Sequence, residues 1–320
     1  MNTDTQCKYA LKGKRIWVAG HRGMAGSAIA RRLEKEDCEV VTVSKNEVNL
    51  LHQDEVHKWL TQAKIDAIFM AAAKVGGILA NSTKPADFIY ENLMIEANII
   101  HAAWQSGVEK LLFLGSSCIF PRNSPQPMTE EMLLQGPLEP TNESYAIAKI
   151  AGIKMCEAYR KQYGCDFISV MPTNLFGPGD RYDADSGHVV AALTMKIHAA
   201  KVKGEKQVIL WGSGKPLREF LYSEDLGDAC VFAMKNYSGG GFLNVGTGKE
   251  MNIRELAERI AAVIGWKGEF IHDASKPDGM PRKVMDVSKM SRLGWTAPTK
   301  FNDGMRAAYA WYLQHVAEKV

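Results

Sequence analysis

Tyr145 and Lys149 are the two residues of this sequence best suited to proton transfer. They stand four apart in Tyr145-Ala-Ile-Ala-Lys149, so on a helix their side chains share a face. A phenol with a pKa of about 10 exchanges protons poorly near neutral pH unless its phenolate is stabilised. Lowering that pKa by about three units takes roughly 4 kcal/mol, and an ammonium about 5 Å away at an effective dielectric of about 20 supplies about 3 kcal/mol. The same spacing is common on exposed helices, so its meaning depends on the preceding chain.

A glycine-rich loop stands near the N-terminus, at Gly20, Gly23 and Gly26. It follows the short apolar run 15–19 and opens an amphipathic stretch, where a first strand turns into a helix. Glycines at this position let the backbone approach a pyrophosphate, and the helix N-terminus stabilises the phosphate charge. The loop therefore predicts a dinucleotide site, and three glycines that only make a turn are the less favoured interpretation.

The end of the second predicted strand, 39–43, indicates which dinucleotide is bound. A carboxylate there binds the 2′-hydroxyl of NAD, but this chain has Ser44, Lys45 and Asn46. With Arg22 in the glycine loop, two cations stand near a group that carries about −1.5 to −2 charge in NADP. A solvated Lys45 without a role is the alternative. We predict that the cofactor is NADP(H).

The predicted strand 110–115 ends in Ser116-Ser117-Cys118. A hydroxyl at the end of that strand can donate a hydrogen bond to a substrate carbonyl, which completes a set of Ser116, Tyr145 and Lys149. The glycine loop, the strand-end serine and the tyrosine–lysine pair are each weak signals alone. In this order along the chain they are strongly specific for a dinucleotide-dependent oxidoreductase.

Short apolar runs alternate with amphipathic stretches through the first half of the chain. We expect strands at 15–19, 39–43, 67–70, 110–115 and 167–171, and helices at 24–35, 53–62, 87–104 and 145–163. Buried strands separated by helices imply a parallel sheet covered on both faces. Beyond Met171 the chain is richer in turns, with further elements at 188–202, 208–211, 242–248, 253–264 and 302–316.

This alternation predicts an α/β fold, a Rossmann-type doubly wound parallel sheet with a smaller C-terminal α/β substrate lobe. We expect residues 14–175 to form the cofactor domain, with 220–248 returning to it. Residues 176–219 and 249–320 are expected to form the substrate domain. An open α/β sheet places its ligand in the crevice at the sheet edge, so the site is expected between the two parts.

Composition excludes several classes of protein. The chain has 320 residues, of which 46% are hydrophobic and 23% charged, so it is not a disordered or collagen-like protein. A formal charge of +3 is too weak to favour nucleic acid or a membrane surface as partner. The six cysteines are scattered without Cys-x-x-Cys pairs, which is untypical of a disulfide framework or a zinc site. No apolar signal core or spanning segment is evident, and we expect a cytoplasmic protein without a bound metal.

Together, the glycine loop, Ser116 and Tyr145-x-x-x-Lys149 resemble the extended short-chain dehydrogenase/reductase family, whose members act largely on nucleotide sugars. Longer strings resemble the branch of it that epimerises C3 and C5 and reduces C4 of GDP-4-keto-6-deoxy-mannose. These strings are Gly20–Ser27, Ala71–Gly77, Leu114–Cys118, Glu139–Asn142, Met171–Leu175 and Lys276–Gly279. The chain departs from that branch by about a dozen polar residues before the first strand, and by Lys45 where an Arg is expected.

The resemblance implies roles for Cys118 and His188. A C4 ketone acidifies the protons at C3 and C5, so epimerisation needs one basic and one acidic group on opposite faces of the sugar. A thiol with a pKa of about 8.5 and an imidazole with one of about 6.5 bracket neutral pH. By resemblance Cys118 is the base and His188 the acid. Reduction at C4 then uses a hydride from NADPH and a proton from Tyr145, while Lys149 also holds the nicotinamide ribose.

The resemblance further implies two sets of binding residues. The expected cofactor contacts are Gly20, Arg22, Gly23, Met24, Gly26, Lys45, Asn49, Leu50, Ala72, Leu114, Ser116, Lys149, Pro172, Thr173, Asn174, Leu175 and His188. The expected substrate contacts are Lys196, Trp211, Arg218 and Asp278. Arg218 is the candidate for bidentate contact with the diphosphate. Trp211 covers the base or the sugar, unless it is an ordinary core residue.

Several alternatives stay open at this point. A 4,6-dehydratase needs a carboxylic acid just after the catalytic hydroxyl, but Ser116 is followed by Ser117, Cys118 and Ile119. A simple 4-epimerase would leave Cys118 and His188 idle. Another nucleotide-sugar epimerase/reductase of the same family is the nearest alternative, and an NADP-sensing regulator without catalysis is a remote one.

A homodimer is expected from the apolar content of the predicted helices 87–104 and 145–163. Members of the family that the sequence resembles pair this part of the fold into a four-helix interface. The alternative is that the apolar faces of both helices are used up against the sheet.

Overall fold

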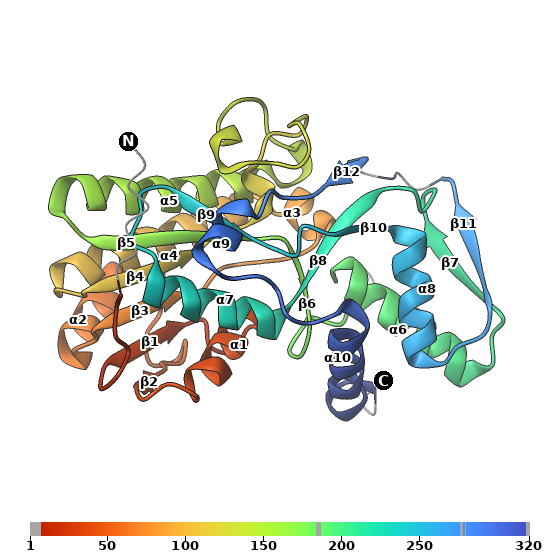
Figure 1. Ribbon diagram of the computed structural model, residues 1–320, viewed down its shortest axis with the longest axis horizontal. Coiled ribbons are helices and arrows are strands. Elements are labelled where there is room, and N and C mark those ends of the chain that lie inside the picture. Colours follow the sequence, from red (N-terminus) through yellow and green to blue (C-terminus); the bar gives the residue numbers. More distant parts are fainter. Residues whose placement is uncertain (1–7, 184–186, 276–277, 279, 318–320) are drawn as a thin grey trace.

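A six-stranded parallel sheet forms the larger part of the molecule (Figure 1). The computed structural model describes residues 8–183, 187–275, 278 and 280–317. The sheet has the order β2-β1-β3-β4-β5-β9 and consists of β1 (Arg15–Ala19), β2 (Glu39–Val41), β3 (Ala67–Met70), β4 (Lys110–Leu114), β5 (Asp166–Pro172) and β9 (Phe242–Val245). All neighbouring strands run parallel. Their carboxyl ends therefore meet at one edge of the sheet. The chain adds β2 on one side of β1 and the later strands on the other side, so the strand order reverses between β1 and β3, where such sheets bind ligands.

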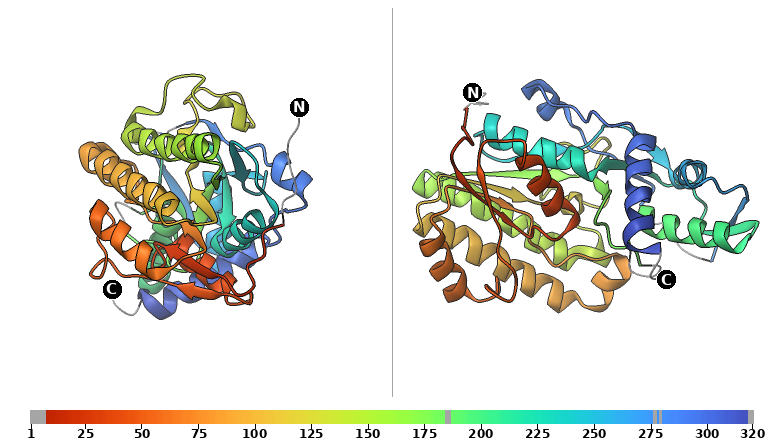
Figure 2. Two further views of the ribbon diagram at one scale, coloured as in Figure 1. Left: turned by 90° about the vertical axis from the view of Figure 1, so that its left-hand side faces the viewer. Right: turned by 90° about the horizontal axis from the view of Figure 1, so that it is seen from below.

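Helices cover both faces of this sheet (Figure 2). One face carries α1 (Met24–Leu33) and α7 (Ser223–Asn236), and the other carries α2 (Gln53–Ala63), α4 (Pro85–Gln105) and α5 (Glu143–Tyr163). Strands β3 and β4 are buried along their whole length, which explains why they read as continuous apolar runs rather than alternating ones. Helices α1 and α7 pack closely, because a Cβ on Gly227 would lie 2.6 Å from the carbonyl oxygen of Ala28.

A smaller lobe lies beside the main sheet, at the right of Figure 1. Its strands are β6 (Asn174–Phe176), β8 (Leu217–Tyr222), β10 (Glu250–Asn252) and β12 (Arg282–Lys283), with a separate pair of β7 (Gln207–Trp211) and β11 (Glu269–Asp273). Helices α6 (Val189–Lys203), α8 (Ile253–Ile264) and α10 (Phe301–His315) bury a third apolar core against these strands. The lobe supplies the wall of the molecule that faces the carboxyl ends of the main sheet.

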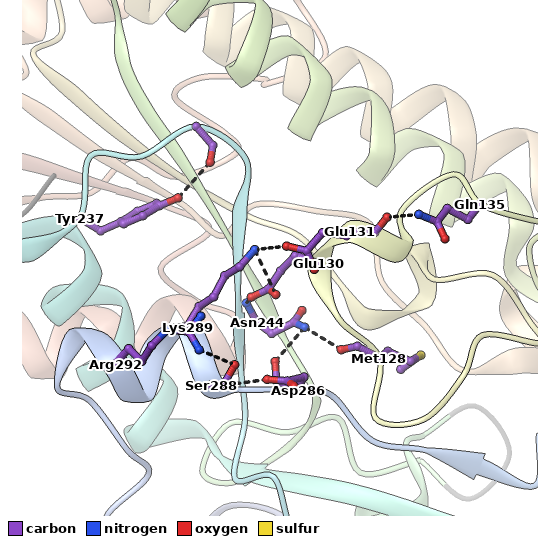
Figure 3. Close-up of polar contacts among 11 residues, drawn as sticks. Met128, Glu130, Glu131, Gln135, Tyr237, Asn244, Asp286, Ser288, Lys289 and Arg292 are labelled. Carbon is purple, nitrogen blue, oxygen red and sulfur yellow. Dashed lines mark hydrogen bonds and ion pairs between the residues drawn. The ribbon is translucent and has the colours of Figure 1, made fainter. Parts of the chain in front are cut away.

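The free edge of β9 is covered by the segment between β4 and α5 (Figure 3). The backbone N–H of Asn244 donates to Glu130 Oε1 at 3.0 Å, and its side-chain amide donates to the carbonyl oxygens of Met128 and Asp286. Lys289 Nζ lies 3.4 Å from Glu130 Oε2 and 2.6 Å from Glu131 Oε1. These bonds close the sheet edge against other chains and tie the segment after Cys118 to the one after β12.

The remaining short elements occupy the connections. They are α3 (Ile78–Thr83), α9 (Ser288–Leu293) and the 3₁₀ turns Ser117–Ile119, Glu130–Met132 and Pro140–Asn142. Among the described residues, no helix combines the length and the apolar character that a membrane span requires.

The predicted α/β class and the parallel sheet are confirmed, and the first five strands begin within one residue of their predicted starts. Two features of the cofactor domain differ from the prediction. Residues 223–236 were not expected to be helical, but they form α7 on one face of the sheet. The return to the cofactor domain was expected to begin at residue 220, but residues 220–222 belong to β8, which pairs with β6, β10 and β12.

Candidate active site

The glycine loop has the shape that a pyrophosphate requires. Gly20 has a φ of +85°, and a Cβ there would lie 2.6 Å from the backbone nitrogen of Ala72. A Cβ on Gly26 would collide with the carbonyl oxygen of Gly20. Helix α1 starts directly after Gly23, and no side chain caps its first turn. Its N-terminal N–H groups therefore suit an anion, so the residues present fit a dinucleotide.

The predicted 2′-phosphate site contains a carboxylate that the sequence analysis did not place there. Arg22 and Lys45 are both exposed, as expected. The turn after β2 folds back, however, so that Glu47 accepts hydrogen bonds from the backbone N–H and the hydroxyl of Ser44, at 2.9 and 2.6 Å. These bonds and the Arg22 charge hold the pKa of Glu47 below its usual value. A bound 2′-phosphate would compete with this carboxylate for Ser44 and Arg22.

The other expected cofactor residues lie along the carboxyl edge of the sheet. Asn49 and Leu50 follow β2, Ala72 follows β3, and Leu114 ends β4. Pro172 ends β5, with Thr173 next to it and Asn174 and Leu175 in β6. The amide of Asn174 donates to the Glu219 carbonyl at 2.8 Å, which joins this edge to the smaller lobe. The structure thus brings residues from five segments to one edge, and their contact with a cofactor stays a prediction.

Lys149 is buried, and two groups contact its ammonium. Its Nζ donates to the carbonyl oxygen of Leu114 at 3.1 Å and lies 3.1 Å from Oε1 of Glu96, a carboxylate of α4. The same Nζ lies 5.9 Å from the ring centre of Tyr145. Glu96 was not among the expected site residues, and no sequence signal marks it apart from its place on α4, a helix that faces α5.

The phenol of Tyr145 has a raised pKa, opposite to the direction expected from the sequence. Burial raises it most, and the nearby Cys118 and Glu96 raise it further, while a hydrogen bond from Ser116 lowers it. The lowered pKa was expected from the charge of Lys149 alone. Because Glu96 lies against that ammonium, the phenol faces an ion pair instead of a lone cation.

Cys118 is a buried free thiol in the turn after β4. Its thiol forms a hydrogen bond with the side chain of Ser116, which also forms one with Tyr145. The three expected groups therefore form one cluster. Burial raises the pKa of the Cys118 thiol, and the charges of Lys283 and Lys149 act against that rise. Lys283 of β12 was not among the expected residues. A basic pair after the Lys276–Gly279 string was the one signal that could have indicated it.

His188 stands at the N-terminus of α6 and lies near Asp180, which is another residue that the sequence did not indicate. His188 Nδ1 lies 3.7 Å from Asp180 Oδ1, and the Asp180 side chain is only 4% exposed. The Asp180 carboxylate raises the pKa of His188 above its usual value, against the effect of burial. The Asp180 carboxylate therefore favours the cationic form of His188. Gly179, next to Asp180, approaches the glycine loop at Met24.

The expected substrate residues line the smaller lobe. Trp211 is 53% exposed, so it is not a core residue, and Lys196 Nζ lies 4.6 Å from its ring centre. Asp278 accepts hydrogen bonds from the backbone N–H and hydroxyl of Ser213, at 2.6 and 2.7 Å. Arg218 is half-buried, and burial lowers its pKa while the Asp278 charge acts against this.

Lys283 connects the two groups of side chains. Its backbone lies opposite that of Arg218 in the register of β12 and β8, and its ammonium interacts electrostatically with Cys118 and Arg218. Electrostatic interactions therefore link Tyr145 and Cys118 to Lys283, and Lys283 through Arg218 to Asp278. Lys276, Pro277 and Gly279 of the string that contains Asp278 lie outside the described residues.

A family model fits this architecture over most of its length. The model of the NAD dependent epimerase/dehydratase family matches residues 16–246, which span the six-stranded sheet from β1 to β9. The chain belongs to this family.

Individual members of the family are similar over nearly the whole chain. The GDP-L-fucose synthase of Sinorhizobium fredii (strain NGR234) is 56% identical over 97% of this chain and 99% of its own. The GDP-L-fucose synthase of Escherichia coli (strain K12) is 51% identical over 95% of this chain and 98% of its own. A solved GDP-L-fucose synthetase from Naegleria fowleri bound to NADP has a TM-score of 0.89 at 29% identity, covering 97% of both chains.

Proposed function

We propose that this protein is an NADPH-dependent enzyme that converts GDP-4-keto-6-deoxy-D-mannose to GDP-L-fucose, by epimerisation at C3 and C5 followed by reduction of the C4 ketone. The observation that carries the proposal is the cluster of Ser116, Cys118 and Tyr145, which sets two proton-transfer groups around one hydroxyl donor. Relatives named GDP-L-fucose synthase at 51% and 56% identity support the choice of substrate.

When bound, NADPH supplies a hydride for C4 of the sugar. The glycine loop and the start of α1 hold its pyrophosphate, and Arg22 and Lys45 face its 2′-phosphate. Lys149 would hold the nicotinamide ribose through its third N–H, since the other two are directed to Glu96 and to the Leu114 carbonyl oxygen. The solved relative from Naegleria fowleri that carries NADP supports this cofactor.

The chain's own residues perform two kinds of proton transfer. Ser116 donates a hydrogen bond to the C4 carbonyl oxygen and polarises it, so that the C3 and C5 protons become acidic. Cys118, as thiolate, removes such a proton, and His188, as imidazolium, returns one from the opposite face. Tyr145 then gives its proton to the C4 oxygen during reduction.

The nucleotide part of the substrate lies along the smaller lobe in this proposal. Arg218 and Lys283 neutralise the diphosphate, and the exposed Trp211 ring covers the base or the sugar. Lys196 and Asp278 border the same surface. The electrostatic interactions of Arg218 with both Asp278 and Lys283 support this placement.

The test is the oxidation of NADPH with GDP-4-keto-6-deoxy-mannose, followed by identification of the sugar by NMR. Formation of GDP-L-fucose is the expected result. A folded protein that oxidises no NADPH with this substrate, or that reduces C4 without inverting C3 and C5, would overturn the proposal. NADH and UDP-linked 4-keto sugars serve as the comparison cofactor and substrates.

In Asp180→Asn, the epimerisation rate is expected to begin its fall on the basic side at a lower pH than in the wild type. His188 must be protonated to act as an acid, and Asp180 raises its pKa. Without that carboxylate the pKa of His188 falls, so the basic limb of the epimerisation rate moves down by about one pH unit. The rate is measured as solvent deuterium exchange at C3 and C5 without cofactor. An unchanged basic limb would contradict the proposed role of Asp180.

Arg22→Ala is expected to weaken NADPH binding by about 2 kcal/mol, or about 30-fold, because one charged hydrogen-bonding partner of the 2′-phosphate is lost. NADH lacks that phosphate, so its binding should change little. The measurement is KM for both cofactors in the wild type and the variant. Lys35→Ala, a change to another basic side chain close by in sequence, is the matched control. An equal loss for both cofactors would place Arg22 elsewhere on the dinucleotide.

We also propose a homodimer formed through α4 and α5. The exposed apolar side chains Tyr90 on α4 and Ile147 on α5, at 60% and 41% exposure, support an interface on this face. A monomer mass in sedimentation equilibrium would refute it.

The five described cysteines are all free, which supports a reducing compartment such as the cytoplasm.

The proposed domain division follows the sheets. Residues 14–175 with the return from α7 to residue 248 form the cofactor domain, and 176–222 with 249–320 form the substrate domain. The return begins at α7 instead of residue 220, because β8 pairs with strands of the smaller lobe.

A further inference from the structure

Glu96 is a buried carboxylate next to the proposed catalytic pair. It lies on α4 with a side chain that is 1% exposed, and its Oε1 is 3.1 Å from Lys149 Nζ. Burial raises the pKa of Glu96, and the charge of Lys149, with hydrogen bonds from Lys149 and the backbone of Gly152, acts against that rise. A buried carboxylate without such a partner is costly, so the charge of Lys149 is what holds it there.

The packing between α4 and α5 leaves room for this carboxylate. The two helices lie side by side (Figure 1), and Gly152 of α5 faces Glu96. A Cβ on Gly152 would lie 2.8 Å from Glu96 Oε2 and would collide with the ring of Phe113 on β4. The glycine therefore lets the Glu96 carboxylate approach the helix that carries Lys149 and Tyr145.

We infer that Glu96 is a positioning residue that keeps Tyr145 and Lys149 protonated together, as phenol and ammonium, and so makes Tyr145 a proton donor. Lys149 spends one N–H on the Leu114 carbonyl and another on Glu96, which fixes the direction of its third. The carboxylate also offsets the ammonium charge that would otherwise draw the proton from the phenol.

The charges around the phenol agree with this assignment. The titratable groups that face Glu96 and Tyr145 are Lys149 and Cys156 on α5 and Cys118 in the turn after β4. Burial, Cys118 and Glu96 all raise the pKa of Tyr145. Removing the Glu96 charge leaves the Lys149 ammonium with the Leu114 carbonyl as its hydrogen-bond partner, so that its uncompensated charge lowers the pH at which Tyr145 loses its proton.

The assignment rests on the proposed function, because it concerns the reduction step. In that step a hydride from the nicotinamide forms the new C–H bond at C4, and the carbonyl π electrons pass to the oxygen. Tyr145 Oη gives its proton to that oxygen and becomes a phenolate, which solvent then reprotonates. The step requires phenol and ammonium together, so its rate falls on the basic side when either proton is lost.

The test compares the pH profiles of reduction and epimerisation in Glu96→Gln. We expect the basic limb of the reduction rate to move down by about one pH unit, so that the rate at a fixed pH above it falls about tenfold. Deuterium exchange at C3 and C5, measured without NADPH, should keep its wild-type profile. Glu96→Asp, which retains the charge, should restore much of the wild-type limb.

Glu130→Gln is the matched control, because Glu130 is also a buried carboxylate but lies at the β9 edge (Figure 3). It should leave the reduction profile unshifted. A Glu96→Gln profile that coincides with that of the wild type would overturn the inference. So would an equal loss of reduction and exchange at every pH, since that is the signature of a purely structural role.

A second measurement separates this inference from the proposed function. The Tyr145 and Lys149 signals are titrated by NMR in protein labelled at tyrosine Cζ and lysine Cε, with Tyr145→Phe and Lys149→Met spectra for assignment. The first deprotonation should occur at lower pH in Glu96→Gln than in the wild type. If the wild type fails to reduce the GDP-sugar but the titration shifts, the proposed function fails and the inference about Glu96 holds; an unshifted titration overturns the inference.

Discussion

Tyr145→Phe is expected to lower the rate of C4 reduction by about 10²–10⁴-fold, the usual contribution of a positioned general acid. The change removes one oxygen and keeps the ring, whose edge-on contact with Phe88 is 6.3 Å between centres. Binding of substrate and cofactor should therefore change little, so that kcat falls and KM does not. Burial and the neighbouring negative groups raise the pKa of the phenol, which therefore holds its proton at neutral pH.

The same variant should still epimerise. Cys118 and His188 carry out that exchange in our proposal, and Ser116 still polarises the ketone. The measurement is NADPH oxidation together with deuterium incorporation at C3 and C5. Tyr163→Phe, a change at an exposed position of the same helix, is the control. Reduction within a few-fold of the wild type would exclude Tyr145 as the proton donor.

Cys118→Ser is expected to abolish epimerisation while reduction persists. A serine hydroxyl is a far weaker acid than a thiol. In the wild type a small fraction of thiolate can remove a proton, whereas in the variant almost no alkoxide is present to do so. A general base contributes about 10²–10⁴-fold, and the loss of C3 and C5 exchange should be of that order. The product released should then be mainly the C4-reduced sugar with C3 and C5 uninverted.

Identification of the sugar by NMR measures this outcome directly. The buried site favours the neutral thiol, and the ammonium groups of Lys283 and Lys149 oppose that effect. The wild-type exchange rate should therefore rise with pH through the pKa of Cys118, and the variant should lose this rise. Cys38→Ser is the control, because its thiol donates only to the Leu33 carbonyl, a bond that a hydroxyl can also make. GDP-L-fucose as the main product of Cys118→Ser would assign the base elsewhere.

Local patterns determined the parts of this protein that depend on neighbours in the chain. The apolar runs from β1 to β5 and the helices between them were predictable, because burial repeats with the period of each element. The glycine loop and the pair Tyr145–Lys149 were predictable for the same reason, since turns and helix faces follow from spacing. The strand-end position of Ser116 and Cys118 completed the cluster.

Only the tertiary structure decided what these elements meet. Burial raises the pKa of Tyr145 most, and Glu96, which reaches Lys149 from another helix, adds to that rise. Glu47 folds back onto Ser44 at the predicted 2′-phosphate site. Asp180 orients His188. A pKa depends on every charge within a few ångströms, and those charges come from segments that no periodicity relates.

The same distinction explains the two differences in the fold. The place of α7 follows from how closely its backbone meets α1 at Gly227. Strand β9 pairs with β5, whereas β8, nearer in sequence, joins the smaller lobe. Periodicity in a sequence reports that one face of an element is buried. Which partner buries it is a property of the whole chain, because long-range pairing depends on shape and packing that are formed together.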